Sequence, residues 1–278
     1  MEYYWYVTVF LFGTIIGSFL NVVIYRLHTG KSTAGRSHCL SCGETLKWYE
    51  LVPLVSYLAL RGTCRTCAAH IPLRYFLVEL FTGASFVFLW WFTEHNLALF
   101  GFHAVIASLL IVIFVYDVRH MIIPDEMVVF LTAASLVLVW YRQGSLDALF
   151  VAMLSGLGMA AFFGAFWLVS RGRWMGLGDA KLAFPLGVLL GPIASISAVV
   201  LSFWIGAAVS LLLLALQKLF RAGMSRTHGW VRGKTRLPFS HVPLRMKSEI
   251  PFAPFLILGF LSAYYFHVDI FTNYIHIF

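Results

Sequence analysis

Two aspartates stand at the edges of apolar segments, where an ionisable side chain is costly and tends to mark function. Asp117 ends one apolar run, and Asp179 lies in Gly176-Leu177-Gly178-Asp179, directly before another. Two neighbouring carboxyl groups, one protonated and one ionised, can activate water and protonate a carbonyl oxygen. If the fold brings these acids together, the sequence predicts a membrane aspartic protease with Asp117 and Asp179 as its catalytic pair.

Helix polarity predicts a division of labour between the two acids. Asp117 closes a helix, where the negative end of the dipole disfavours a carboxylate, whereas Asp179 opens one, where the dipole favours it. We therefore expect Asp179 to act as the base and Asp117 as the acid, although a coupled pair shares its proton. Gly176 and Gly178 would permit a tight turn and a close approach of another backbone. They are predicted to support the site.

Lys181 and Asp125 are the other candidates for supporting the site. Lys181 could hold Asp179 or a substrate oxygen, or it could anchor its helix at the interface. Asp125 follows Pro124, and an acid in the first turn of a helix is stabilised by the helix dipole. A structural role at a helix start is therefore sufficient to explain Asp125.

All four cysteines fall into two Cys-x-x-Cys pairs, Cys39 with Cys42 and Cys64 with Cys67. Two such pairs can supply the tetrahedral thiolate set of a Zn²⁺ ion, and four ligands leave no open position for catalysis. Disulfides and inert thiols are the alternatives, but reduced cytosolic thiols fit metal binding better. The pattern predicts a structural zinc site, in which a flanking histidine, His38 or His70, could replace a cysteine.

The composition is that of a polytopic membrane protein. Hydrophobic residues make up 60% of the chain and charged residues only 12%, against about 25% charged in soluble domains. The net charge of +8 reports mainly which loops face the cytoplasm and anionic lipid. We therefore expect contact with membrane lipid and no nucleic-acid partner.

The apolar segments predict an all-α fold with about eight transmembrane helices. They cover residues 4–25, 75–91, 97–116, 127–141, 146–169, 182–195, 196–216 and 252–266. The split between the sixth and seventh spans rests on Gly191-Pro192. Asn21 is expected to bond from the first helix to another one, because a buried amide in lipid needs a partner.

The predicted organisation is a first helix over residues 1–27, a small zinc-binding insertion over residues 28–74 and a protease domain over residues 75–278. Lys and Arg are concentrated in the insertion and in the loop 218–250, which places both in the cytoplasm. The acids then face the cytoplasm and both termini lie outside it. The first span carries no cleavage site for a signal peptidase, and the apolar segment 48–58 is expected to form a helix at the membrane surface.

With these residues in view, the chain resembles the type IV prepilin peptidase family, the bifunctional leader peptidases and N-methyltransferases of the GxGD type. The likeness covers nearly the whole sequence. It rests on residues 17–26, the cysteine segment, residues 74–80 and 250–255, and the two aspartate motifs.

The resemblance implies a multi-pass enzyme of the bacterial inner membrane. Such an enzyme removes the short basic leader from type IV prepilins or from the pseudopilins of type II secretion. It then methylates the new amino terminus with S-adenosylmethionine. No residues of the methyl-transfer site can be assigned from the sequence, and the length of the basic loop 218–250 departs from the family pattern.

Three other functional classes remain open at this point. A zinc-stabilised scaffold or binding module would account for the cysteines but not for the acid pair. An intramembrane protease of the presenilin or signal peptide peptidase type shares Tyr116-Asp117 and the Gly-Leu-Gly-Asp motif, but it leaves the cysteines unexplained. An ion-coupled transporter would place acids deep within its spans, whereas these acids lie at the edges.

Overall fold

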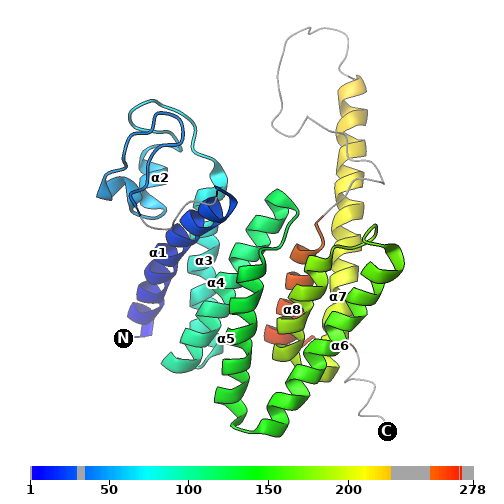
Figure 1. The fold of residues 1–278 in the computed structure, drawn as a ribbon. Helices are drawn as coiled ribbons and strands as arrows, with labels where there is room; N and C mark the ends of the chain where they lie inside the picture. The colour runs from blue at the N-terminus through cyan, green and yellow to red at the C-terminus, as the bar shows by residue number, and fades with distance from the viewer. Residues whose placement is uncertain (1, 30–34, 227–250, 269, 271–278) are drawn as a thin grey trace. The chain divides into compact units, whose positions relative to one another are not determined.

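The computed structural model describes residues 2–29, 35–226, 251–268 and 270, and every regular element among them is helical (Figure 1). The described chain divides into two compact units, Met1–Pro192 and Ile193–Phe278. The predicted all-α fold is confirmed. The eight predicted spans correspond to α1, α3, α4, α5, α6, the two parts of α7 on either side of Gly191, and α8.

The first unit is a bundle whose successive long helices run in alternate directions (Figure 1). Its helices are α1 (Glu2–Thr29), α3 (Leu73–Phe92), α4 (Leu97–His120), α5 (Asp125–Gln143), α6 (Leu146–Ser170) and the first part of α7 (Leu177–Arg226). Between α1 and α3, the described part of the cysteine segment adds only the short 3-10 helix η1 (Trp48–Leu51) and α2 (Val55–Ala59). The second unit contains the rest of α7 and α8 (Ala253–Tyr265).

The helix α7 is interrupted where the sequence predicted a boundary between two spans. Gly191 has φ 75° and ψ 179°, a conformation that is strongly disfavoured for residues other than glycine. Pro192 follows it and has no N–H to continue the helical ladder. The predicted split is confirmed.

The basic loop starts later than predicted. Residues 218–226 were expected to belong to it, but they extend α7 to Arg226. This extension has a simple reason, because the Lys, Leu, Ala, Met and Arg residues of this segment are good helix formers. The remainder of the predicted loop, residues 227–250, lies outside the described residues.

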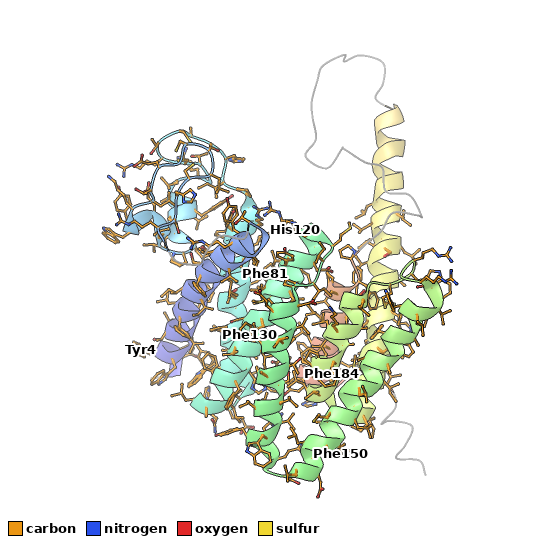
Figure 2. All side chains as sticks on the ribbon, in the orientation of Figure 1. Tyr4, Phe81, His120, Phe130, Phe150 and Phe184 are labelled. Carbon is orange, nitrogen blue, oxygen red and sulfur yellow. The ribbon has the colours of Figure 1, made fainter. Side chains whose placement is uncertain are left out.

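Five of the described helices are long and apolar enough to cross a bilayer. They cover Tyr3–Leu27, Leu73–Phe92, Leu97–His120, Leu146–Ser170 and Leu177–Leu216. The shorter α8 and the helix α5 are not among these five. Large apolar side chains such as Phe81, Phe130 and Phe150 point outwards (Figure 2), as lipid contact favours. The multi-pass membrane character is confirmed.

The helices α1 and α3 pack antiparallel at very short range through glycines. A Cβ atom on Gly13 would lie 2.8 Å from the Cα atom of Gly83, and one on Gly17 would lie 2.8 Å from the Cα atom of Glu79. One end of the same interface carries the predicted cross-helix bond, since the Asn21 amide donates to the Tyr75 carbonyl at 3.0 Å. Small residues let the backbones approach, and a buried amide then finds its partner.

The helices α5, α6 and α7 form a second packed layer. Val139, Ala152 and Val188 make its core, with Phe184 packed against them (Figure 2). Here too glycines meet, because a Cβ atom on Gly187 would lie 2.8 Å from the Cα atom of Gly156. This close contact positions the first part of α7, which begins with the Gly-Leu-Gly-Asp motif.

The α1/α3 contact predicts a large effect from a single methyl group. Gly13→Ala should push the two backbones apart and cost about 1–3 kcal/mol of stability, as overpacking usually does. We expect a melting temperature in detergent at least about 2 °C below that of the wild type. Gly101→Ala in α4 is the matched control, since its Cβ atom would meet nothing within 4 Å. Equal melting temperatures for the two variants would contradict the packing argument.

Candidate functional site

The two predicted acids lie together at one end of the bundle. Asp117 is in the last turn of α4 and Asp179 in the first turn of α7. Their residues are only 5% and 8% exposed, and the two side chains are close enough to repel each other electrostatically. Residues 62 positions apart in the chain are therefore joined in one buried acidic site.

The backbone around the acids is shaped by the turn after α4 and by the glycines before α7. Met121 ends α4 in the left-handed region with φ 54°, and its N–H donates to the Asp117 carbonyl at 2.8 Å. Two residues later, Ile123 lies against Gly178, where a Cβ atom would be 3.3 Å from its side chain. The Gly176 N–H donates to the Asp179 carboxylate. Gly178 thus allows the close approach, while Gly176 orients the acid.

Lys181 and Asp125 form an ion pair that sequence reasoning did not identify. The Lys181 ammonium lies 2.8 Å and 2.9 Å from the two carboxylate oxygens of Asp125. Their side chains are 44% and 69% exposed, so the pair contributes at most about 1 kcal/mol to stability. It connects the starts of α5 and α7 beside the acids. Both residues stand at helix starts on the side of the membrane that the sequence predicts to be cytoplasmic. This shared position is the one signal in the sequence that could have indicated the pair.

The four cysteines are gathered in one cluster outside the bundle. Their sulfur atoms all lie within 4.8 Å of one another, and those of Cys39 and Cys67 are 3.9 Å apart. Four sulfurs each bound about 2.3 Å from a Zn²⁺ ion lie about 3.8 Å from one another. The residues therefore fit a tetrahedral metal site, as the spacing predicted.

The two cysteine pairs form equivalent knuckles. In each knuckle the first cysteine's carbonyl accepts the N–H of the residue four positions later, Gly43 or Ala68, at 2.9 Å. These two residues have φ 76° and 54°, which turns the chain sharply behind each pair. Isolated β-bridges close both turns, His38 with Thr45 and Thr63 with His70. The repeat of this geometry gives two matched halves that could together hold one metal ion.

Both flanking histidines bond to the backbone. The Nδ1 atom of His70 lies 3.0 Å from the Gly62 carbonyl oxygen, and that of His38 lies 3.4 Å from the Arg36 carbonyl oxygen. Neither histidine belongs to the ligand cluster. The four cysteines thus form the complete ligand set among the described residues.

The knuckle geometry prepares one thiol for metal binding. Backbone N–H groups of Cys42 and then Ser41 lower the pKa of the Cys39 thiol to about 6. At Cys67 the Ala69 amide favours the thiolate, but desolvation and the adjacent thiols outweigh it and raise the pKa to about 11. A metal ion would therefore have to displace protons from the cluster, which makes metal binding weaker at low pH.

The segment predicted as one surface helix is in fact two short ones. The 3-10 helix η1 and α2 are separated at Leu54, which has φ 60°. Pro53 precedes it and disfavours a helical conformation at Val52. The break lets the Leu54 N–H donate to the Glu79 carboxylate of α3 at 2.8 Å, which ties the cysteine segment to the bundle.

Two family models match the chain. The Bacterial Peptidase A24 N-terminal domain covers residues 11–93, and the Type IV leader peptidase family covers residues 104–211. The first range contains all four cysteines, and the second contains both buried acids. The cysteine cluster and the acid pair therefore fall within two separate, adjacent family matches.

Curated relatives are similar over most of the chain. A prepilin leader peptidase/N-methyltransferase of Vibrio cholerae is 34% identical over 209 residues, which cover 69% of this chain and 79% of the relative. One of Burkholderia pseudomallei is 31% identical over 285 residues, which cover 91% of this chain and 83% of the relative.

A third relative, of Myxococcus xanthus with the same name, is 36% identical over 215 residues. This match covers 75% of the chain but 63% of the relative, so the chain spans less than two thirds of that protein. No solved structure matches the chain. Since a relative 34% identical is matched over 79% of its length, the chain belongs to the type IV leader peptidase family.

Proposed function

We propose that the chain is a membrane aspartic endopeptidase that removes the basic leader from type IV prepilins or pseudopilins and then methylates the new amino terminus. The observation that carries this proposal is the buried pair of Asp117 and Asp179 at one end of the bundle. The names of the relatives, which join a leader peptidase to an N-methyltransferase, support the two activities.

The acid pair supplies both proton transfers of peptide hydrolysis. The ionised carboxylate takes a proton from a water molecule, whose oxygen attacks the peptide carbonyl carbon. The protonated carboxyl donates its proton to the carbonyl oxygen. Collapse of the tetrahedral species breaks the C–N bond, and the amine leaves with a proton from the pair. Helix polarity favours Asp179 as the base and Asp117 as the acid.

The position of the acids suits a substrate that is partly embedded in the membrane. Both acids lie within one turn of the ends of apolar helices. A prepilin would place its apolar helix in the bilayer and its basic leader in the cytoplasm, so that the scissile bond lies at the height of the pair. The buried carboxylates also attract a positively charged leader.

The proposed location is the bacterial inner membrane, with the site at the cytoplasmic face and both termini outside the cytoplasm. The basic residues of the insertion 28–74 and of the segment 218–250 support this orientation through the positive-inside rule. The same charges suit anionic lipid. Residues 75–278 are proposed to form the protease domain. Within it, Gly176, Gly178, Lys181 and Asp125 are proposed to support the acids.

The cysteine cluster is proposed to hold a structural Zn²⁺ ion, and the methyl donor is proposed to be S-adenosylmethionine. Cys39, Cys42, Cys64 and Cys67 would supply all four zinc ligands. Such a closed site stabilises a small fold outright. The segment 35–72 has few hydrogen-bonded elements of its own, so a metal ion is the natural source of its stability.

The rival functions account for less of the structure. A presenilin-like protease would use the acid pair but has no need of a four-cysteine knuckle cluster. An ion-coupled transporter would place its acids near the bilayer midplane, whereas Asp117 and Asp179 lie at helix ends. A prepilin and a generic transmembrane peptide, compared as substrates by mass spectrometry, separate these classes. Equal cleavage of both peptides would favour a presenilin-like intramembrane protease.

Asp117→Asn and Asp179→Asn should each abolish leader removal while the protein stays folded. An amide can neither take a proton from water nor donate one like a carboxyl group, and general acid–base catalysis contributes about 10²–10⁴ in rate. We expect purified variants to cleave a prepilin at least about 100-fold more slowly, with unchanged elution in size-exclusion chromatography. Retained cleavage by either variant would refute the assignment.

Asp125→Asn is the matched control for the two acids. It removes one carboxylate at the same end of the bundle, but from an exposed ion pair worth at most about 1 kcal/mol. We expect appreciable leader removal to remain in the same assay. Complete loss of cleavage at normal expression would instead make Asp125 a catalytic candidate.

The zinc site predicts a metal content that depends on the cysteines. The wild type should carry about one zinc per chain by elemental analysis, since four thiolates complete one tetrahedral site. The double variant Cys39→Ser, Cys42→Ser should lose the metal, and acidification should release it from the wild type because protons compete for the thiolates. Zinc content that is unchanged in the double variant would show that these cysteines are not the ligands.

A further inference from the structure

The helices η1 and α2 of the cysteine segment expose apolar side chains. Val55 and Leu58 of α2 are 61% and 64% exposed, and Trp48 of η1 is 79% exposed. Side chains three residues apart lie on the same side of a helix. The two short helices pack against each other, and neither contains a buried residue. An exposed apolar surface of this kind marks contact with a membrane or a partner, and we call it the η1/α2 surface (Trp48, Leu51, Val55 and Leu58).

The helix α2 lies along the first turns of α3, at the end of the bundle where α3 begins (Figure 1). The N–H of Leu54, which directly precedes α2, donates to the Glu79 carboxylate at 2.8 Å. The Tyr57 ring lies 5.3 Å from the Phe76 ring. Glu79 is six residues after Leu73, the first residue of α3. Leu54 is therefore held about 9 Å along the helix from the start of α3.

The length of α3 relates this contact to the membrane. The helix has 20 residues, or about 30 Å, and the hydrocarbon core of a bilayer is also about 30 Å thick. The start of α3 therefore lies at the boundary of the hydrocarbon, and Leu54 lies up to about 9 Å below it. Amphipathic elements bury their apolar faces to about 5–10 Å at this boundary. The sequence alone predicted a helix on the membrane surface, whereas the bond to Glu79 requires Leu54 to lie below it.

The backbone at this depth is hydrogen-bonded within the protein. Leu54 has φ 60°, which separates η1 from α2, and its N–H would be costly in lipid without an acceptor. Glu79 supplies that acceptor from α3. The N–H groups that follow donate to backbone carbonyls at 2.6 Å to 3.1 Å, and they belong to Val55, Ser56, Leu58 and Leu60. The break at Leu54 is thus compatible with lipid, and an acid in the apolar helix α3 has a structural reason.

Basic residues border the η1/α2 surface. Lys47 directly precedes η1 and Arg61 follows α2, and both are exposed. The guanidinium of Arg65 lies 5.5 Å from the centre of the Tyr49 ring. Over residues 35–74, two acids, Glu44 and Glu50, stand against five basic residues, Arg36, Lys47, Arg61, Arg65 and Arg74. Such a surplus of positive charge attracts anionic lipid headgroups.

We propose that the η1/α2 surface docks into anionic lipid in the leaflet next to the start of α3. Its apolar side chains lie among the acyl chains, and Lys47 and Arg61 bind the lipid phosphates. The occupant is lipid because Leu54 is fixed at the depth where lipid surrounds α3, and because the basic border complements phosphate. The cysteine cluster is then held at the membrane by a third attachment besides α1 and α3. This inference rests on the membrane character of the chain and not on the proposed hydrolysis or methylation.

Photolabelling of the wild-type protein in nanodiscs tests the docking. The nanodiscs contain phosphatidylglycerol and phosphatidylcholine, with a trace of phosphatidylglycerol that carries a diazirine on its acyl chain. Trypsin cleaves after Lys47 and Arg61, so mass spectrometry separates the peptide 48–61 from the peptide 37–47. We expect label on 48–61 and at least about tenfold less on 37–47, whose knuckle lies outside the depth of the acyl chains. Absence of label from 48–61 would overturn the proposal, as would cross-links from this peptide to a second copy of the chain.

A carboxylate placed on the η1/α2 surface should expel it from the lipid. Leu58→Asp should lower the label on 48–61 at least about tenfold, because a charged side chain among acyl chains is costly. Leu40→Asp is the matched control, since Leu40 is another leucine of the cysteine segment that is 56% exposed, and it should leave this label unchanged. Unchanged label in Leu58→Asp that elutes like the wild type in size-exclusion chromatography would contradict the docking. If the variant does not fold, the wild-type labelling decides.

The lipid class is tested by changing the headgroup of the probe. Phosphatidylglycerol and phosphatidylcholine probes with the same diazirine should label wild-type 48–61 with a preference of at least about threefold for the anionic lipid, because each basic residue near an anionic surface strengthens binding. The double variant Lys47→Gln, Arg61→Gln should lose this preference, and chymotrypsin replaces trypsin for its digestion. Equal labelling of the wild type by the two probes would overturn the role of anionic lipid.

Discussion

Two carboxyl groups buried at one end of an apolar bundle are costly to maintain, and the surrounding structure is arranged to hold them. Removing a charge from water carries a large penalty, which is reduced when one proton is shared and when N–H groups support the ionised form. Asp117 and Asp179 are each within one turn of a helix end, and the Gly176 N–H supports Asp179. The helices α5 and α6 cross and return between them, so that the end of α4 meets the start of α7.

The need to hold the two buried carboxyl groups together also explains where glycines and close helix packing occur. Gly178 has no Cβ, and this lets Ile123 from the turn after α4 lie against the first turn of α7. Deeper in the bundle, Gly156 and Gly187 hold α6 and α7 at short range. A residue with a larger side chain at any of these positions would move the start of α7. The position of one acid thus depends on contacts that lie far from it.

Features set by local residue type and spacing could be predicted from the sequence, whereas features set by tertiary contact could not. The aspartates stood out because charge is rare in apolar segments, the cysteines because of their spacing, and Gly191 because it precedes a proline. The bond from Lys181 to Asp125 joins residues 56 apart, and no local pattern pairs them. The break at Leu54 likewise depends on Glu79, which belongs to a separate helix.

The position of the acids bears on the order in which the two proposed reactions would occur. Methylation requires a free amine, and this amine exists only after hydrolysis. In the proposed function, the cleaved pilin would keep its apolar helix in the bilayer, so its new amino terminus would stay at the height of Asp117 and Asp179. Confinement at that height would raise the effective concentration of the amine for the second of the two proposed reactions.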